Sequence, residues 1–172
     1  EKTGLSCLAL NQLLQAELNP GVSSEAGCPF RPGDKVIQVK NDYVLGLANG
    51  DVGHVLEVGV ERRNGRAIVV KFADIDMPVD IPMRNHNLDL AYCLTLHKFQ
   101  GSESPIVVIP IHRSFGPMVL QRSWMYTSIS RARKTCVLIG DPEEVWRATF
   151  RDRQQSRWTG LAERLRATGA AS

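Results

Sequence analysis

The N-terminal segment carries apolar residues at near-helical spacing, followed by a stop signal. Spacing of this kind indicates an amphipathic helix. A residue before proline avoids the helical region, so Asn19-Pro20-Gly21 is expected to end the helix. A polar loop rich in Ser and Gly then runs to about Pro32. The periodic apolar positions of the predicted helix are Leu5, Leu8, Leu10, Leu13, Leu14 and Leu18.

The next stretch, from Gly33 to Pro82, alternates apolar and polar residues in short runs. Alternation with a period of two is typical of β-strands, and Asn64-Gly65 is a strong hairpin signal. Four or five short strands within about fifty residues favour a small β-barrel. The runs are Lys35–Lys40, Gly53–Val58, Val58–Glu61, Ala67–Phe72 and Val79–Pro82.

Beyond Arg84 the pattern changes to apolar runs that alternate with helical segments. Buried strands are predicted at Leu88–Cys93, Ile106–Ile111 and Thr135–Ile139. Strands that alternate with helices imply a parallel sheet covered on both faces. The sequence therefore predicts an α/β domain into which the β-rich middle is inserted.

Helices are expected between and after these strands. One short helix is expected at Thr95–Gln100, stopped by Gly101, and a longer one at Val119–Arg133. Asp141 and Pro142 start a further helix as cap and first residue. A last amphipathic helix contains Trp158, Leu161, Ala162 and Leu165.

Length and composition narrow the class of protein only moderately. The 172 residues suit one domain, or one domain with a small insert, and the 43% hydrophobic content is enough for a core. A net charge of +3 permits a nucleic-acid partner but does not argue for one. There is no initiator Met, so we expect a fragment or a processed chain.

The cysteine pattern and the hydropathy argue against zinc-binding, disulfide-rich, secreted and membrane-spanning proteins. The four cysteines form no C-x-x-C pair, so we predict no metal site and no disulfide framework, but free thiols in a reducing cytoplasm. No signal peptide and no apolar run of transmembrane length is present in the sequence, so we expect a cytoplasmic protein without membrane contact.

Two segments carry candidate chemistry. Thr95–Glu103 follows a predicted buried strand, and ligands of open α/β sheets bind at the carboxyl ends of strands. Its hydroxyl, imidazole, ammonium, amide and carboxylate groups suit phosphate and sugar contacts, although a solvated polar loop explains them equally well. Tyr126–Lys134 ends a predicted helix with three basic residues, which the helix dipole alone would favour. Alternatively, one arginine there neutralises charge on a transferring phosphoryl group.

Four segments together resemble the second motor domain of superfamily 1 DNA helicases of the RecD-like and TraA-like type. The string AYCLTLHKFQGSESPIVVIP resembles their motif V, and YTSISRARKTCVLIGD resembles their motif VI. LNQLLQAELNP is similar to the beginning of that domain, and FRPGDKVIQVKNDYVLGLANGDVGHV to its inserted Src-homology-3-like barrel. The resemblance implies a RecA-like motor domain over residues 1–29 and 86–172, with the barrel at 30–85.

The resemblance also implies roles for individual residues. Arg131 matches the arginine of motif VI and would be the arginine finger toward the ATP γ-phosphate. Gln100, Gly101 and Glu103 match the motif V turn at the nucleotide, with Glu103 toward the ribose. Two departures are visible: Ser130 replaces a frequent Thr and keeps the hydroxyl, whereas Phe99 replaces a small Ser and loses it.

DNA contacts are implied for Thr95 and His97, with Lys98 nearby, and for Lys35 and Lys40 in the barrel. The barrel would ride beside single-stranded DNA and bind it independently of base sequence. Ordinary surface charge is the competing interpretation for its basic residues. Asn41-Asp42-Tyr43 could supply a polar or stacking contact, but Tyr43 could equally fill the barrel. The basic residues of this region are Lys35, Lys40, Arg62, Arg63, Arg66 and Lys71.

The sequence has no G-x-x-x-x-G-K-[ST] loop and no acidic pair that ends an apolar strand. In helicases of this type those two elements bind ATP and Mg²⁺, and they lie in the first motor domain. We therefore expect the parent protein to be an ATP-dependent DNA helicase, of 5′ to 3′ polarity by resemblance, and this chain alone to lack ATPase activity.

Several alternatives remain open at this point. The chain could be a non-enzymatic single-stranded DNA-binding module or an inactive, structural helicase-fold domain. The expected partners are single-stranded DNA, the first motor domain of the same polypeptide, and further repair or conjugation subunits. The sequence does not decide between a repair helicase, the α subunit of an exonuclease V complex and a conjugative relaxase-helicase.

Overall fold

The computed structural model describes residues 5–21, 27–84, 86–152, 160 and 166. The chain divides into two compact units, Glu1–Glu103 and Ser104–Ser172. The predicted last helix, around Trp158 and Leu161, lies outside the described residues. Within the described part of the chain, no helix has the length and hydropathy needed to cross a membrane.

The first unit begins with helix α1 (Cys7–Leu18), which confirms the predicted N-terminal helix. The Ser6 hydroxyl caps it by accepting from the Ala9 amide at 3.2 Å. Its buried side chains are amides, Asn11 and Gln15, whereas Leu8 is 71% exposed. The apolar spacing therefore located the helix, but polar side chains dock it.

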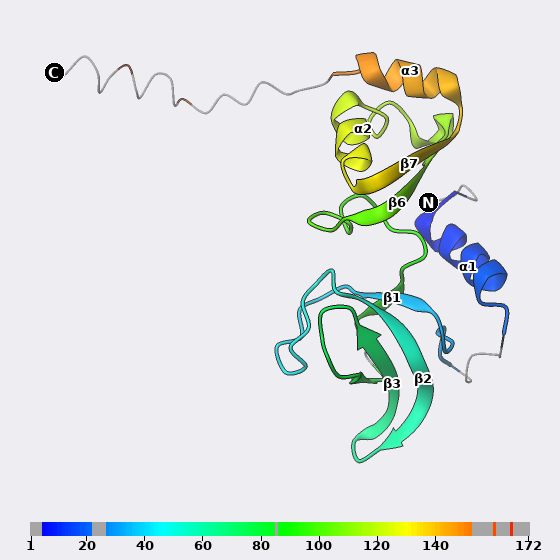
Figure 1. Ribbon diagram of the computed structural model, residues 1–172, viewed down its shortest axis with the longest axis vertical. Coiled ribbons are helices and arrows are strands. Elements are labelled where there is room, and N and C mark those ends of the chain that lie inside the picture. Colours follow the sequence, from blue (N-terminus) through cyan, green and yellow to red (C-terminus); the bar gives the residue numbers. More distant parts are fainter. Residues whose placement is uncertain (1–4, 22–26, 85, 153–159, 161–165, 167–172) are drawn as a thin grey trace. The chain divides into compact units, whose positions relative to one another are not determined.

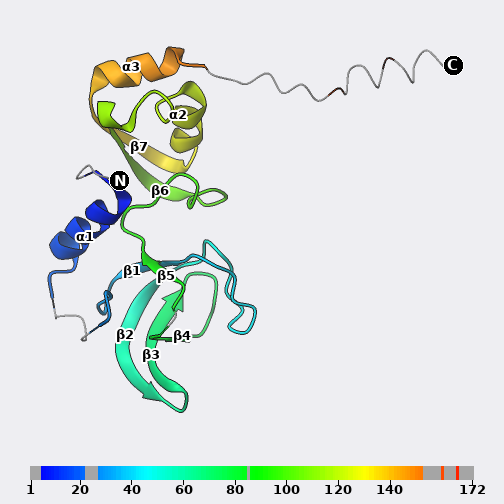
Figure 2. The same ribbon diagram turned by 180° about the vertical axis from the view of Figure 1, so that it is seen from behind.

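The rest of the first unit is a coiled antiparallel sheet of five strands (Figure 1). Its spatial order is β4-β3-β2-β1-β5, and register shifts along β2 interrupt its pairing with β3. In the described residues β4 and β5 remain edge strands, so the sheet is not closed into the predicted barrel (Figure 2). The strands are β1 (Lys35–Gln38), β2 (Val52–Arg62), β3 (Gly65–Phe72), β4 (Val79–Pro82) and β5 (Leu88–Leu90).

Strand β5 corrects one expectation about the predicted Leu88–Cys93 strand. It pairs antiparallel with β1, Val36 opposite Leu90, and does not join a parallel sheet. The strand covers only Leu88–Leu90, and a bond from the Ala91 amide to the Lys35 carbonyl, at 2.8 Å, continues its pairing with β1. An apolar run does not show which sheet a strand joins. The backbone hydrogen bonds with β1 place Leu88–Leu90 in the antiparallel sheet.

The concave side of this sheet holds a contiguous apolar core. Alternate strand positions supply it, as expected for an antiparallel sheet with one buried face. Leu45, Val58, Ile75, Val79, Met83 and Leu90 pack around it. Its buried members are Cys28, Phe30, Val36, Leu47, Val55, Ile68, Val70, Phe72, Ile81 and Leu88.

A buried carboxylate joins α1 to this sheet. Asp34 is fully buried and accepts hydrogen bonds from Gln15 Nε2 at 2.5 Å and Asn19 Nδ2 at 2.8 Å. It also accepts from the Arg31 amide at 2.7 Å and the Tyr92 hydroxyl at 3.0 Å. Burial, and then the bond to Asp34, raise the pKa of Tyr92, so this phenol remains a donor at neutral pH.

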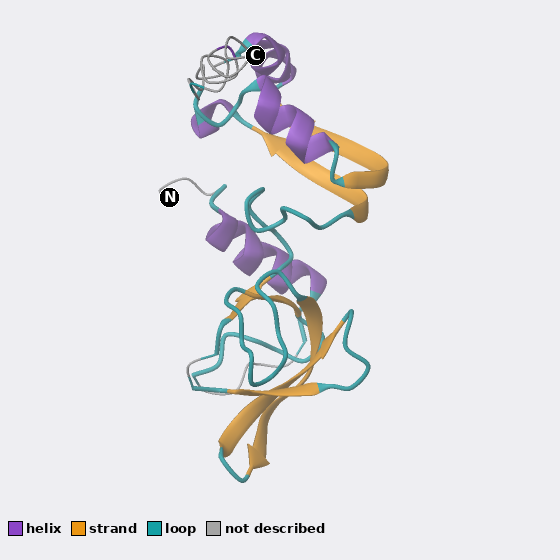
Figure 3. Ribbon diagram, turned by 90° about the vertical axis from the view of Figure 1, so that its left-hand side faces the viewer, coloured by secondary structure: helices purple, strands orange, loops and turns teal. Residues whose placement is uncertain are grey.

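The second unit is built on two parallel strands, β6 (Ser104–Ile111) and β7 (Ala132–Gly140). The connection between them contains a 3-10 turn, Arg113–Phe115, and helix α2 (Arg122–Ile129), and helix α3 (Pro142–Phe150) follows β7. The parallel pairing of these two predicted strands is confirmed. Figure 3 shows the strands with helices along them.

One face of the parallel pair is covered and the other is open. Ile109 and Ile111 face α2 and α3 and pack with Leu120, Met125 and Ala148. The alternate positions point away from these helices and stay exposed. The open apolar face consists of Ile106 (59% exposed), Val108 (55%), Val137 (38%) and Ile139 (57%).

The predicted helix at Val119–Arg133 is shorter in the structure. Helix α2 ends at Ile129, and β7 already begins at Ala132. The cause is the pairing of Ala132 with Ser104 at the start of the parallel ladder, which pulls the basic residues Arg133 and Lys134 into the strand. These two cations therefore do not end a helix.

The end of β7 confirms the predicted start of α3. Gly140 has φ +129°, and a Cβ at this position would stand 1.9 Å from the Ile111 carbonyl oxygen. The Asp141 amide donates to that same oxygen at 3.1 Å. The Asp141 carboxylate then caps the helix by accepting from the Glu143 amide at 2.9 Å, and Pro142 is its first residue.

Candidate nucleotide and nucleic-acid contacts

The segment Thr95–Glu103 forms consecutive turns, not the short helix that was predicted. The Phe99 amide is shared between the carbonyls of Thr95 and Leu96, at 3.1 and 3.2 Å. Gly101 has φ +83°, which ends the turns because other residues rarely adopt that conformation. The segment follows an antiparallel strand, so the argument from the carboxyl end of a parallel strand was wrong for it.

The hydroxyl and the cations of this segment lie at its surface. Thr95, His97 and Lys98 are all exposed. The Thr95 hydroxyl accepts from the Lys98 amide at 3.3 Å, which keeps the turn closed. The Lys98 ammonium contacts the Asp89 carboxylate at 2.5 Å, and both side chains are about half exposed. Exposed pairs of this kind stabilise a fold by at most about 1 kcal/mol, so an incoming phosphate can compete for the lysine.

Helix α1 holds the beginning of this segment. The Asn11 side chain donates to the Cys93 carbonyl and accepts from the Cys93 amide, each at 2.8 Å. This pair of bonds fixes the backbone two residues before Thr95. Sequence reasoning missed Asn11 and Asp34, because a polar residue among leucines and a turn aspartate give no signal without their partners.

Gln100, Gly101 and Glu103 complete the predicted nucleotide-facing turn. All three are exposed, and they end the first unit of the chain. Arg131, by contrast, belongs to the second unit. The motif V turn and Arg131 are therefore described separately, each within its own unit.

Arg131 is the half-buried residue between α2 and β7. Its Nε donates to the Thr127 carbonyl at 3.3 Å, and its amide donates to the Ser128 carbonyl at 3.2 Å. Its own carbonyl accepts from the Ser104 amide at 3.0 Å, which ties it to the start of β6. Backbone and guanidinium are both anchored, so the orientation of this side chain is restrained.

The hydroxyl next to Arg131 has a local role. Ser130 Oγ donates to the Thr127 carbonyl at 2.9 Å, the same oxygen that accepts from the arginine. Thr127 Oγ1 in turn donates to the Ser123 carbonyl at 2.8 Å. These bonds close the last turn of α2 beneath the guanidinium.

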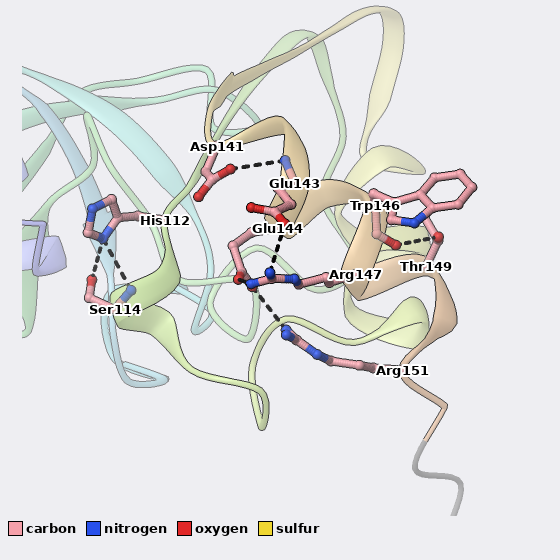
Figure 4. A network of polar contacts seen from close by, with 9 residues as sticks. All are labelled: His112, Ser114, Asp141, Glu143, Glu144, Trp146, Arg147, Thr149 and Arg151. Atoms are coloured by element: carbon pink, nitrogen blue, oxygen red, sulfur yellow. Dashed lines mark hydrogen bonds and ion pairs between the residues drawn. The ribbon is translucent and has the colours of Figure 1, made fainter.

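A second polar cluster, on α3, is structural (Figure 4). The buried Glu144 carboxylate accepts from Arg147 at 2.9 Å and from Arg151 at 3.1 Å. The hydrogen bond from Arg147, and then that from Arg151, lower the pKa of Glu144. Arg147 also reaches Glu143 at 2.8 Å, one helical turn before it.

The basic residues of the first unit differ in their surroundings. Lys40 is exposed directly after β1, and Lys35 is half-buried within β1 opposite His54. Arg62 pairs with Asp80 at 2.6 Å, and this carboxylate holds the guanidinium against β4. Lys71 donates to the Ile75 carbonyl at 2.5 Å. Among the described residues, no cluster of His, Cys, Asp and Glu is arranged to hold a metal ion.

Two family models match the chain, in the order in which the units occur. Residues 10–72 match the ATP-dependent RecD-like DNA helicase SH3 domain, and residues 90–139 match the UvrD-like helicase C-terminal domain. The chain is a relative of the RecD-like DNA helicases. The first match contains Lys35 and Lys40, and the second contains the Thr95–Glu103 segment and Arg131.

Individual relatives agree with these models. The ATP-dependent RecD2 DNA helicase of Deinococcus radiodurans is 37% identical over 92% of this chain. The RecBCD enzyme subunit RecD of Mycobacterium tuberculosis is 29% identical over 92%, and a probable conjugal transfer protein TraA of Sinorhizobium fredii is 28% identical over 73%. The chain spans 21% of the length of the first relative and 26% of the second.

Solved structures show the same fold at low sequence identity. A Bacteroides Pif1 helicase, in complex with ADP-AlF3 and single-stranded DNA, matches 96% of this chain and 44% of its own chain, with a TM-score of 0.59 and 16% identity. Candida albicans Pif1 matches 76% of this chain and 37% of its own, with a TM-score of 0.52 and 18% identity. These neighbours confirm the predicted RecA-like α/β class, and the RecD-like SH3 match over residues 10–72 confirms its SH3-like part.

Proposed function

We propose that this chain is the second motor domain of an ATP-dependent DNA helicase that moves 5′ to 3′, with residues 30–85 as an insertion. The UvrD-like C-terminal match over residues 90–139 carries the proposal, because it contains every residue assigned to the nucleotide. The identity with the RecD2 helicase of Deinococcus radiodurans supports the same activity. ATP and Mg²⁺ are then bound mainly by the first motor domain of the same polypeptide.

Arg131 is the proposed arginine finger. A guanidinium presents a planar fork of donors and keeps its charge at any physiological pH, which suits the oxygens of a transferring phosphoryl group. Its anchoring at Thr127 supports this role, since a restrained cation needs less reorganisation when the charge develops. Gln100, Gly101 and Glu103 are the proposed nucleotide contacts in the first unit.

Thr95, His97 and Lys98 are the proposed contacts to the DNA backbone, together with Lys35 and Lys40. The side chains of Thr95, His97, Lys98 and Lys40 are exposed, and the turns of the segment present a hydroxyl and two nitrogen donors at one loop. Phosphate contacts of this type do not read sequence and weaken with salt. Exchange of Lys98 from Asp89 to a phosphate would couple DNA binding to this loop.

The names of the relatives suggest further partners. RecD is a subunit of the RecBCD enzyme, and TraA proteins act in conjugal transfer. Other repair or conjugation subunits are therefore proposed partners of the complete protein, in addition to single-stranded DNA.

The test of the finger is Arg131→Ala in the complete protein. DNA-stimulated ATP hydrolysis should fall by about 10³-fold or more, the range measured for arginine fingers elsewhere. Arg133→Ala, an exposed neighbour in β7, is the matched control and should retain hydrolysis. Binding of single-stranded DNA should stay within about threefold in both variants. Normal hydrolysis with lost DNA binding in Arg131→Ala would refute the assignment.

The isolated chain tests whether ATP hydrolysis requires the first motor domain. Without a phosphate-binding loop it should show no ATP turnover above background with single-stranded DNA present. Robust turnover would overturn the proposal. The alternative, a DNA-binding module without enzymatic activity, makes two predictions. The isolated chain would bind single-stranded DNA with strong salt dependence, and the complete protein would show no ATPase activity.

A further inference from the structure

Two cysteines that are far apart in the sequence meet in the first unit. Cys7 Sγ lies 3.6 Å from Cys93 Sγ and 3.3 Å from the Cys93 carbonyl oxygen. The residues are separated by 86 positions, and both side chains are half-buried. Formation of a disulfide would shorten this separation to the ~2.05 Å of an S–S bond.

The backbones of this pair are already held together. Asn11 lies one helical turn after Cys7, and its side chain makes both hydrogen bonds to the Cys93 backbone. Residues four apart share a helix face, so the face of α1 that docks on Cys93 is the face that carries the Cys7 thiol. Asn11 therefore holds the backbones of the two cysteines close together.

The surroundings make Cys7 the more reactive thiol. The hydrogen bond to Cys93 and the Lys98 ammonium lower the pKa of Cys7 to about 7, while burial and Asp89 act in the opposite direction. Cys7 is also the first residue of α1, where the helix dipole favours an anion. The hydrogen bond with Cys7, and then burial, raise the pKa of Cys93. When the pair loses one proton, the remaining proton therefore stays on Cys93.

We propose that Cys7 and Cys93 form a redox-active pair, which a hydroperoxide oxidises to an intramolecular disulfide that ties α1 to the segment entering Thr95. The Cys7 thiolate attacks the peroxide oxygen, breaks the O–O bond and becomes a sulfenic acid, and the hydroxide released takes up a proton to form water. The Cys93 sulfur then attacks the Cys7 sulfur and forms the S–S bond. The hydroxide that leaves Cys7 takes the Cys93 proton as a second water.

The other two cysteines provide an internal comparison. Cys28 is buried in the core of the first unit, and burial raises its pKa. Cys136 packs in the core of the second unit. All four thiols are reduced in the structure, and only Cys7 and Cys93 are in sulfur–sulfur contact in the described residues. The proposal concerns thiol chemistry and does not depend on the proposed helicase activity.

The experiment treats this chain with hydrogen peroxide at neutral pH and maps the peptides by mass spectrometry. The expected product is a monomer that has lost two hydrogen atoms, with one linked peptide pair containing Cys7 and Cys93. Cys136→Ser should give the same product, whereas Cys7→Ser and Cys93→Ser should give none. Sulfinic acid at Cys7 without a link, a link to Cys28 or Cys136, or a disulfide-linked dimer would each overturn the proposal.

A second measurement uses the reduced protein and separates the pair from a chance proximity. The rate of Cys7 alkylation should reach half its maximum near pH 7, as its pKa of about 7 requires. Cys93→Ala, which removes the hydrogen-bond donor, should move this midpoint upward, and Lys98→Gln should move it by less, because Cys93 has the larger influence on the thiolate. An unchanged midpoint in Cys93→Ala would refute the coupling, and circular dichroism of each variant verifies the fold.

Discussion

The two units of the chain differ in how completely they bury the apolar side chains of their strands. The antiparallel sheet of the first unit closes a core from its own residues, with Val36, Ile68 and Val70 fully buried. The parallel strands of the second unit bury Ile109 and Ile111 on one face only, and leave Ile106 and Val108 exposed on the other. Parallel sheets normally have both faces covered, so the open face marks a surface that further structure can cover.

The connections between paired strands also differ between the units. The β2–β3 hairpin pairs residues across a two-residue turn, so the sequence of one hairpin specifies its own register. The β6–β7 pair needs a crossover through α2, and each strand leaves an outer edge in the described residues. The first unit also contains a long-range pair, since Val36 of β1 lies opposite Leu90 of β5. It buries its core among its own strands, whereas β6 and β7 leave one face uncovered.

The largest expected effect is in the core of the first unit. Phe72→Ala removes a ring that is 1% exposed, and should lower the free energy of unfolding by about 3–5 kcal/mol. Hydrogen exchange of the β2–β3 amides measures it. Trp124 and Trp146 lie in the second unit and report on it by fluorescence, whereas the third tryptophan, Trp158, lies outside the described residues.

If the first unit is self-contained, the tryptophan fluorescence transition should shift much less than the exchange of the β2–β3 amides. Phe150→Ala, which removes a ring that is 68% exposed, is the control and should change stability by less than about 1 kcal/mol. Equal shifts of both signals in Phe72→Ala would break the comparison between the units.

The next effect compares two isoleucines of the same strand. Ile109→Ala should destabilise the second unit by about 2–5 kcal/mol, because Ile109 packs against α2 and α3. Ile106→Ala, on the open face, should cost less than about 1 kcal/mol. Urea denaturation followed by tryptophan fluorescence measures both. Similar losses would show that the open face is covered in solution.

A smaller effect is expected where β7 leaves the sheet. Gly140→Ala adds a Cβ that would meet the Ile111 carbonyl, and should cost about 1–3 kcal/mol in strain. Gly116→Ala is the matched control, since Gly116 also has a positive φ but open space around a Cβ. The difference in melting temperature between the two variants isolates the clash from the backbone preference. Equal losses would assign the whole effect to φ.

The smallest effect is a pH dependence on α3. The pKa of Glu144 is lowered in the folded chain, so its ion pairs stabilise the fold at neutral pH and are lost as the pH falls. Glu144→Gln should lower the melting temperature at pH 7 and reduce its decrease between pH 7 and pH 4. Glu17→Gln, at an exposed position of α1, should leave that decrease unchanged. An unaltered acid profile in Glu144→Gln would contradict this role.

Much of the fold was predictable from local signals. Leucine spacing located α1, Asn64-Gly65 located the β2–β3 hairpin, and Asp141-Pro142 located the start of α3. The boundaries were less predictable. The end of α2 is set by the Ser104–Ala132 pairing, and a strand at Leu88–Leu90 pairs with whichever neighbour is close in space.

The candidate site shows the same limit. The motif-like strings identified Arg131 and Thr95–Glu103, and the relatives place both strings within one helicase domain model. Nothing in the strings indicated that Asn11 would hold Cys93, or that Gln15 and Asn19 would share Asp34. Their roles in contacting ATP and DNA remain predictions, for which the Arg131→Ala assay is the direct test.

The sequence by itself located α1, the β2–β3 hairpin and the start of α3, and indicated the resemblance to RecD-like helicases, because helical spacing, turn chemistry and motif strings are local properties of the chain. Only the tertiary structure decided that α1 docks through amides, that β5 joins the antiparallel sheet, and that Cys7 meets Cys93. The physical reason is that a polar or sulfur contact is specific to its partner, and the partner here stands up to 86 positions away.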